Sequence, residues 1–272
     1  NWKYREGGGF DQMTKYHHLA VQAYGESKSL EEYARKSQAA DAMGHRCLWE
    51  TWNLARNRAT GVLFWYNNTP IPQLGSHAWD YDLNQEAAFF AQRNALEPLH
   101  AQFEYLSNRV CVVSDIVADK RLSARAEVYD FNTRKVWERE VVLEVKAETV
   151  VDAFAIPFDS LNQSNNPNDP NNRTIRRLPH FIKLRLFESG KEIASTFYWR
   201  SNSAYSEEKR EEAVGPCAGG FEALANLPRT TLRVERMAKG VRVTNTGDRL
   251  AFFVRIKATK GDKYTLTFWA KA

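Results

Sequence analysis

The hydrophobic pattern of this chain changes near residue 105, and the change limits the folds that the chain can adopt. Before that point apolar residues recur at intervals of three and four, whereas after it they alternate with polar residues. The first spacing places side chains on one face of a helix, and alternation places them on one face of a strand. The sequence therefore predicts a mainly helical section followed by a series of strands.

Two helices are expected in the first sixty residues. An apolar seam over residues 13–24 stops at Gly25, a residue suited to the left-handed position that follows a helix. Ser29 and Glu32 then form a capping-box pattern, which is typical of a helix N-terminus. Small and apolar residues recur at helical spacing up to about Ala55: Leu30, Tyr33, Ser37, Ala40, Gly44, Cys47, Leu48 and Thr51.

The segment Gly61–Tyr66 is apolar throughout, which is typical of a strand buried on both faces of a parallel sheet. A loop to about Gln85 and a short helix over residues 86–94 are expected to follow it. The order helix, strand, loop, helix is that of a (β/α) repeat, and one repeat cannot close a barrel by itself. We therefore interpret residues 1–104 as the terminal segment of a (β/α)₈ TIM barrel whose other strands lie outside this chain.

About six short alternating strands with turn residues between them are expected from Val110 to Trp199. This pattern predicts an immunoglobulin-like antiparallel β-sandwich over residues 105–203. Residues 162–173, rich in Asn and Pro, are expected to form a surface loop. Residues 204–220 are predicted to be a linker and residues 221–272 a partial second sandwich, so the expected fold class is multidomain α+β.

Charge and cysteine content exclude several classes of function. The net charge of +5 is spread along the chain, which gives weak support to nucleic-acid binding. Cys47, Cys111 and Cys217 lack metal-ligand spacing, so we expect no metal site. No apolar run approaches the roughly 20 residues of a membrane helix. The start of the chain lacks a signal-peptide pattern. The parent protein could still be secreted or periplasmic, because this pattern does not decide its location.

Four collinear segments resemble the last barrel segments of exo-β-D-glucosaminidases and endo-β-mannosidases of glycoside hydrolase family 2. They are Tyr24–Gly25, residues 29–38, residues 59–68 and residues 97–100. The resemblance extends through the sandwich at residues 190–192 and 198–199. Residues 241–256 are similar to the start of that family's last domain, so the chain resembles the C-terminal portion of such an enzyme.

The resemblance implies a retaining β-glycosidase, which uses two carboxyl groups about 5 to 5.5 Å apart as nucleophile and acid/base. In the family both catalytic glutamates precede the segment that matches residues 29–55, so no residue of this chain is expected to be catalytic. Glu6 lacks the surroundings of the nucleophile motif. The implied partners are a β-linked oligosaccharide or glycoside and the remainder of the barrel, and no cofactor is expected.

Trp65, Asn67 and Asn68 are the leading candidates for sugar contact. An indole face suits the C–H groups of a sugar ring, and the resemblance places Trp65 at the floor of the cleavage site. Side-chain amides at the carboxyl end of a barrel strand can donate to and accept from hydroxyl groups. The competing interpretations are a core tryptophan and two turn-forming asparagines.

Trp79 and Tyr81 lie on the following loop and are predicted to border the substrate cleft. Packing of that loop explains Trp79 equally well. Asp80 could recognise a cationic amino sugar, although a lone loop aspartate is more often a cap. His100 is interpreted as part of the junction between barrel and sandwich rather than as a catalytic group.

Two other classes of function compete with the glycosidase. The strand-rich half could be a non-catalytic carbohydrate-binding or structural module, because it carries several aromatic residues. A nucleic-acid or protein adaptor is favoured only by the basic charge and ranks last. Titration of the sandwich with oligosaccharides would show no change if the sandwich is only a spacer, and the adaptor would require binding that persists in high salt.

Overall fold

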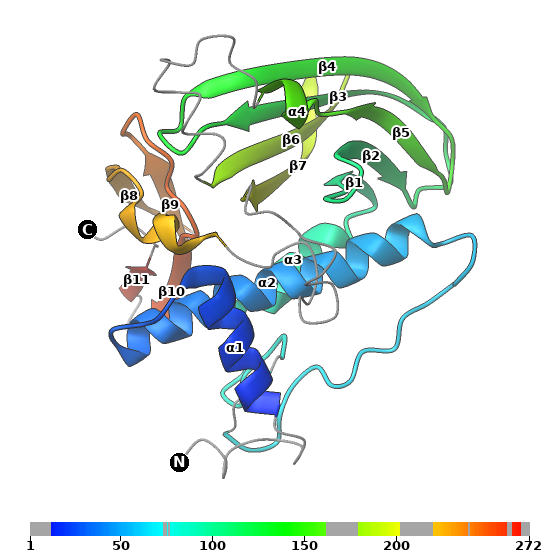
Figure 1. Ribbon diagram of the computed structural model, residues 1–272. Coiled ribbons are helices and arrows are strands. Elements are labelled where there is room, and N and C mark those ends of the chain that lie inside the picture. The colour runs from blue at the N-terminus through cyan, green and yellow to red at the C-terminus, as the bar shows by residue number, and fades with distance from the viewer. Residues whose placement is uncertain are drawn as a thin grey trace.

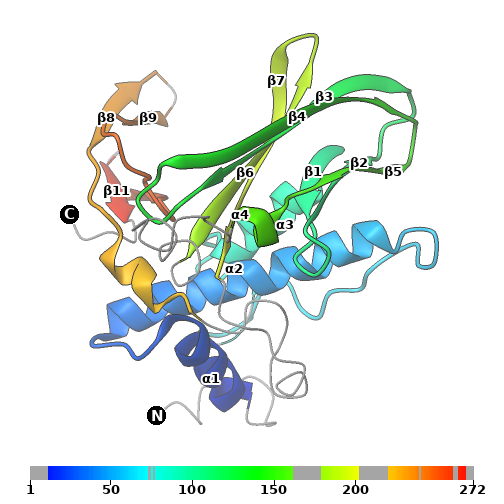
Figure 2. The same ribbon diagram turned by 45° about the horizontal axis from the view of Figure 1, so that its top comes forward.

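The computed structural model describes residues 12–72, 75, 77–161, 179–201, 220–238, 240–259 and 263–267. Three helices come first: α1 (Gln12–Tyr24), α2 (Leu30–Leu54) and α3 (Ala87–Ala95). Antiparallel strands follow, and α2 runs beneath them in both views (Figure 1, Figure 2). The change of hydrophobic period predicted this order, in which helices precede strands. The expected loop at residues 162–173 and most of the expected linker lie outside the described residues.

Local sequence explains where α1 and α2 begin and end. Gly25 follows α1 with φ of +74°, and its N–H donates to the carbonyl of Val21 at 2.7 Å. The Ser29 hydroxyl accepts from the Glu32 N–H at 3.1 Å, and the Glu32 carboxylate accepts from the Lys28 N–H at 2.9 Å. The predicted helix start and its capping box are confirmed, with the carboxylate reaching one residue further back than a standard capping box.

The segment 61–66 forms no strand, so the prediction of a buried parallel strand is wrong for this chain. Leu63 is 101% exposed and Trp65 is 88% exposed, and the Trp65–Tyr66 peptide bond is cis. A parallel strand is formed by hydrogen bonds to neighbours on either side. Among the described residues no strand runs beside this segment, and therefore it stays an extended loop between α2 and α3.

Residues 99–161 and 179–200 form the predicted β-sandwich. One sheet has the order β1 (Leu99–Phe103), β2 (Arg109–Ser114), β5 (Val150–Ala155). The other has the order β4 (Lys135–Val145), β3 (Lys120–Tyr129), β6 (His180–Glu188), β7 (Lys191–Arg200). A short helix, α4 (Phe158–Leu161), follows β5. The antiparallel sandwich is confirmed, and β1 extends it into the range that was expected to belong to the barrel.

Alternation in the strands produces the core of the sandwich. Val128, Ala126 and Ala124 of β3 lie opposite Ile182, Leu184 and Leu186 of β6, and all six are buried. Their sequence neighbours point to the other face of the sheet, because successive side chains alternate. That outer face carries Tyr129, Glu127 and Arg125 on β3.

The C-terminal section consists of a 3-10 helix, η3 (Glu222–Asn226), and two hairpins. β8 (Leu232–Met237) pairs with β9 (Gly240–Asn245), and β10 (Arg255–Thr259) pairs with β11 (Lys263–Thr267). The four expected strands are present, as two separate two-stranded sheets. Both views place this section beside one end of the sandwich (Figure 2).

A second apolar cluster joins the three sections. It contains Tyr24 of α1, Met43 of α2, Trp199 of β7, Phe221 before η3 and Phe252 before β10. The Trp199 ring contacts the Phe252 ring at 5.2 Å, and the Trp199 indole N–H donates to the Tyr24 hydroxyl at 2.9 Å. The helices, the sandwich and the C-terminal section therefore share one core. None of the helices within the described residues is both long and apolar enough to span a membrane.

Candidate functional site

Backbone hydrogen bonds bring the two ends of the candidate loop together. The carbonyl oxygen of Asn67 accepts from the N–H groups of Ala78 and Trp79, each at 3.1 Å. The Glu86 N–H donates to the Ala78 carbonyl at 3.0 Å, so the loop closes directly before α3. Asn67 and Trp79 therefore lie side by side, and the side chains of Asn67 and Asn68 are exposed.

Trp65 projects from the start of this loop. Its ring contacts only the edge of the Tyr66 ring, with centroids 6.1 Å apart, among the described aromatic residues. With 88% of its surface exposed, Trp65 is not a core residue of this chain. Its indole face is available to a ligand or to another polypeptide.

The other predicted loop residues differ in their surroundings. Trp79 is half-buried and packs against Phe89 of α3 with ring centroids 4.9 Å apart, which favours the packing interpretation. Tyr81 is 49% exposed and is free to contact a ligand. Asp80 accepts from the backbone N–H and the side-chain amide of Asn84, each at 2.8 Å, so it serves as a turn cap.

Two histidines, His45 and His77, pack against aromatic residues of the loop. His77 packs against Tyr66 with ring centroids 5.0 Å apart, and His45 of α2 packs against Phe64 at 5.0 Å. Burial lowers the pKa of His45 to about 4, and the nearby His77 adds to that shift. His45 is therefore neutral at pH 7, and its 3.5 Å contact with Asp41 is not an ion pair.

A hydrogen bond to one ring nitrogen sets the tautomer of His45. The Gln92 side-chain amide donates to Nδ1 at 2.8 Å, which leaves the proton on Nε2, facing Asp41. Burial raises the pKa of Tyr16, and the charge of Asp41 raises it further. The contact between His45 and Phe64 packs the loop against α2, and the contact between Tyr66 and His77 joins two parts of the loop. Isolated histidines give no spacing pattern, so the sequence could not single them out.

A buried polar network joins α2 to the sandwich. The Glu50 carboxylate contacts the His100 Nε2 at 3.0 Å and accepts from the Tyr198 hydroxyl at 2.6 Å. The Gln102 amide donates to the Glu50 carbonyl at 2.9 Å. His100 therefore lies at the junction, where the sequence placed it. The network has no open path to solvent, because all four side chains are buried.

The described residues contain no group of three His, Cys, Asp or Glu side chains arranged to hold a metal ion. Cys111 is buried, and its thiol donates to Asp152 at 3.1 Å. Burial, followed by the hydrogen bond and charge of Asp152, raises the pKa of this thiol to about 12. Cys111 thus stays a protonated thiol, as the interpretation of a buried apolar cysteine expected. Cys217 and Glu6 lie outside the described residues.

Comparison with known families identifies the sandwich. Residues 108–202, which run from just before β2 to just after β7, match the Mannosidase Ig/CBM-like domain. An exo-β-D-glucosaminidase from Arthroderma benhamiae is 23% identical over 283 residues and covers 96% of this chain. A mannosylglycoprotein endo-β-mannosidase from Lilium longiflorum is 24% identical over 206 residues and covers 73% of this chain.

Solved structures share the fold over most of the chain. An exo-chitosanase from Amycolatopsis orientalis superposes with a TM-score of 0.72 at 23% identity, over 90% of this chain and 30% of its own. A β-D-mannosidase from Dictyoglomus thermophilum gives a TM-score of 0.70 at 14% identity, over 98% of this chain and 31% of its own.

The chain spans only part of its relatives: 30% of the length of the Arthroderma protein and 20% of the Lilium protein. Both are named as enzymes that act on glycosides. The sandwich match, the relatives and the shared fold agree with one another. Residues 108–202 therefore match a Mannosidase Ig/CBM-like domain, and most of the chain is similar in sequence and fold to proteins named exo-β-D-glucosaminidase and β-mannosidase.

Proposed function

We propose that this chain is the C-terminal portion of a retaining β-glycosidase of the exo-β-D-glucosaminidase or β-mannosidase type. Its parent hydrolyses O-glycosidic bonds of β-linked saccharides with two glutamates that lie outside this chain. The support is that the relatives are glycoside hydrolases several times longer than the chain. The isolated chain is then inactive, since it supplies neither the nucleophile nor the acid/base.

The main support for this proposal is the exposed apolar segment 61–66. Leu63 and Trp65 are almost fully exposed on a stretch without a charged residue. Exposed apolar surfaces of this kind mark sites that another surface covers. In the proposal, barrel strands of the parent pair with both sides of this segment, which then becomes the last strand of the barrel.

The loop after that strand would lie at the carboxyl end of the barrel, where barrel enzymes bind substrate. Trp65 stacks on the sugar, and the side-chain amides of Asn67 and Asn68 bind its hydroxyl groups. Tyr81 and Trp79 border the side where the leaving group departs. Two hydrogen bonds to the Asn67 carbonyl oxygen fix the main chain at this position, and the exposed side chain projects from it.

The first test compares the isolated chain with the full-length parent on nitrophenyl β-D-glucosaminide and nitrophenyl β-D-mannoside. We expect turnover by the parent alone. Equal turnover by the isolated chain would refute the claim that its catalytic glutamates lie elsewhere.

The second test is Trp65→Ala in the parent. Loss of a stacking ring should lower kcat/KM at least about tenfold, which corresponds to about 1.4 kcal/mol of transition-state binding. Trp65→Phe should recover part of the activity. Val117→Ala, at a sandwich position that is 86% exposed, is the matched control. Equal kinetics for Trp65→Ala and Val117→Ala would exclude Trp65 from the sugar site.

A second candidate function is non-catalytic saccharide binding by the sandwich. One observation favours it, an aromatic-lined cleft on the outer face of the four-stranded sheet. Titration of the isolated chain with saccharides separates the two functions, because hydrolysis requires the parent and binding in the cleft does not.

A further inference from the structure

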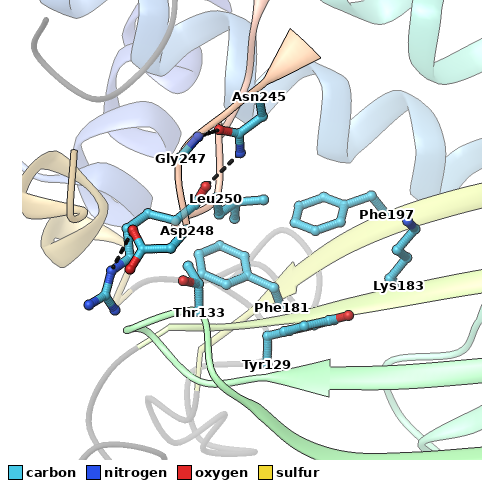
Figure 3. A pocket seen from close by; sticks show the side chains of 10 residues that line it. Tyr129, Thr133, Phe181, Lys183, Phe197, Asn245, Gly247, Asp248 and Leu250 are labelled. Carbon is cyan, nitrogen blue, oxygen red and sulfur yellow. Dashed lines mark hydrogen bonds and ion pairs between the residues drawn. The ribbon is translucent and has the colours of Figure 1, made fainter. Parts of the chain in front are cut away.

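A cleft of about 400 Å³ lies between the sandwich and the C-terminal section (Figure 3). One wall is the outer face of the four-stranded sheet. Strand register places Tyr129 opposite Phe181, and Lys183 opposite Phe197. The Phe181 and Phe197 rings stack with centroids 5.7 Å apart. Cavities that bind small ligands begin at roughly 300 Å³, so the cleft can hold one or two sugar rings.

The other wall is the loop from Asn245 to Leu250, which its own hydrogen bonds hold in place. The Asn245 amide donates to the Arg249 carbonyl at 2.6 Å, and its oxygen accepts from the Gly247 N–H at 3.1 Å. The Arg249 guanidinium donates to the Asn132 carbonyl at 2.6 Å, which ties this loop to the turn after β3. A Cβ atom at Gly247 would lie 2.4 Å from the Thr230 hydroxyl, so the loop requires glycine there. Both walls are therefore fixed before any ligand binds.

Two polar groups on the cleft wall lack partners within the part of the chain that the structure describes. The Thr133 hydroxyl is buried without a hydrogen bond. The Lys183 side chain is half-buried beside Phe197, and its ammonium group forms no ion pair among the described residues. A buried polar group without a partner is costly, and such groups are rare in folded proteins. A ligand that accepts hydrogen bonds would satisfy both.

We propose that this cleft is a second saccharide-binding site, distinct in position from the Trp65 loop, and that its ligand is a neutral hexopyranose unit. The half-buried rings of Tyr129 and Phe197 can pack against the C–H groups of a sugar ring, whereas Phe181 is fully buried behind them. Sugar hydroxyl groups both donate and accept, so they can pair with the Lys183 ammonium, the Thr133 hydroxyl and the Asp248 carboxylate together. The choice of a β-linked saccharide rests on the proposed function. The description of the cleft does not depend on that function.

The charges in the cleft decide between neutral and charged ligands. Arg249 lies 3.6 Å from Asp248, so these two charges offset each other and Lys183 supplies the remaining one. Lys183 repels the ammonium group of a glucosamine unit. An apolar ligand would leave Lys183 and Thr133 without partners. A neutral mannose unit is not repelled by Lys183, and its hydroxyl groups can bind both Lys183 and Thr133.

The test titrates the full 272-residue chain with β-1,4-mannotriose and with the β-1,4-glucosamine trimer at pH 6, by calorimetry. We expect saturable binding of mannotriose and at least about tenfold weaker binding of the glucosamine trimer. Lys183→Met and Thr133→Val should each weaken mannotriose binding about tenfold, the usual effect of losing a hydrogen bond to a charged or buried group. Val117→Ala should bind as the unaltered chain does, and melting temperatures check that every variant is folded.

Three results would overturn the proposal. The first is that mannotriose does not bind. The second is that folded Lys183→Met binds mannotriose as the unaltered chain does. The third is that Trp65→Ala is the one variant that loses binding. The last result would place the saccharide at the loop instead and would agree with the proposed function. Conversely, a parent without glycosidase activity would refute the proposed function and leave cleft binding intact, because the calorimetry uses the isolated chain.

Discussion

Glu50 is a buried carboxylate on α2 that contacts His100 of β1 and Tyr198 of β7. Only 5% of its surface is exposed. The Tyr198 hydroxyl in turn accepts from the Phe103 N–H at 3.2 Å, so one carboxylate orders groups on two strands from different sheets. A buried network of this kind stabilises only while every member keeps its partner.

Glu50→Ala is expected to destabilise the chain by about 3 kcal/mol, because it leaves His100 and the Tyr198 hydroxyl buried without their shared acceptor. Glu144→Gln is the control, since its side chain is 70% exposed and its loss should change stability by less than about 0.5 kcal/mol. Urea unfolding followed by circular dichroism measures both. Equal midpoints for the two variants would contradict the structural role of Glu50.

His180 makes the stability of the chain depend on pH. It is fully buried against Phe158, with ring centroids 4.9 Å apart. Neither ring nitrogen has a hydrogen-bond partner among the described residues. Burial, and secondly the positive charge of Arg200, lower the pKa of His180 to about 3. The folded chain therefore holds this histidine neutral.

The unfolded chain binds a proton at His180 below about pH 6.5, whereas the folded chain does not until about pH 3. The contribution of His180 is therefore complete above pH 6.5 and falls as the pH decreases toward 3, by up to about 1.4 kcal/mol per unit. His180→Phe should flatten the pH dependence of the unfolding free energy between pH 4 and 7. His18→Gln, at an exposed position, should not. Parallel curves for His180→Phe and the unaltered chain would contradict this assignment.

At the scale of elements, α2 is the longest of the described helices, with 25 residues, and it packs against the other sections. Its start is fixed by the Ser29 cap, and Glu31 and Glu32 lie in its first turn, where negative charge is favourable. Its buried face carries Lys36, whose ammonium group donates to the carbonyl oxygens of Gly25 and Glu26 at 3.1 and 2.7 Å. The turn between α1 and α2 is thus bound to the helix that follows it.

Ser29→Ala should destabilise the chain by about 1 kcal/mol, because the Glu32 N–H loses its acceptor. Ser29→Asp should keep nearly full stability, since a carboxylate accepts the same hydrogen bond. Thermal unfolding of the two variants measures the difference. If both variants melt at the same temperature, the cap does not contribute to stability.

At the scale of the whole molecule, the apolar cluster around Phe252 joins the C-terminal section to the helices and the sandwich. Phe252 is 1% exposed, and its ring contacts Trp199, Phe181 and Phe197 at centroid distances of 5.2, 5.8 and 6.4 Å. These three partners lie on the two strands at one edge of the four-stranded sheet. The C-terminal section is therefore packed against the sandwich rather than merely connected to it.

Phe252→Ala should cost about 3 to 5 kcal/mol, as is usual when a buried aromatic side chain is truncated. Because the cluster is shared, the loss should lower the unfolding midpoint of the sandwich as well as that of the C-terminal section. Val234→Ala, at a position that is 47% exposed, is the control. Hydrogen exchange that quickens only after residue 220 would show instead that the two sections unfold independently.

Local patterns were sufficient to predict several elements. The cap at Ser29 and the stop at Gly25 depend on residues adjacent in sequence, and the structure confirms both. Alternation predicted β2 to β7. It missed β1, because His100 and Gln102 are polar and yet buried against α2. Their partners lie about fifty residues away, and no local pattern reports them.

The predicted sugar contacts depend on more than local sequence. The residue types at Trp65, Asn67 and Asn68 and the family resemblance suggested a binding loop, and their role stays a prediction. The structure adds that Trp65 is exposed, that Trp79 packs on Phe89 and that Asp80 caps a turn. The cleft at Lys183 could not be predicted, because its walls come from β3, β6 and β7 and from the loop 245–250, and no local pattern shows that these segments meet.

The sequence by itself determined the order of helices and strands, the helix ends and the alternating faces of the sandwich, because each depends on neighbours within a few residues. Only the tertiary structure decided which polar groups are buried together, which aromatic rings form the shared core, and that segment 61–66 is an exposed loop here. The physical reason is that an apolar stretch favours burial without specifying what buries it. A strand needs partners, and the partners of this segment are not supplied by the described residues of this chain.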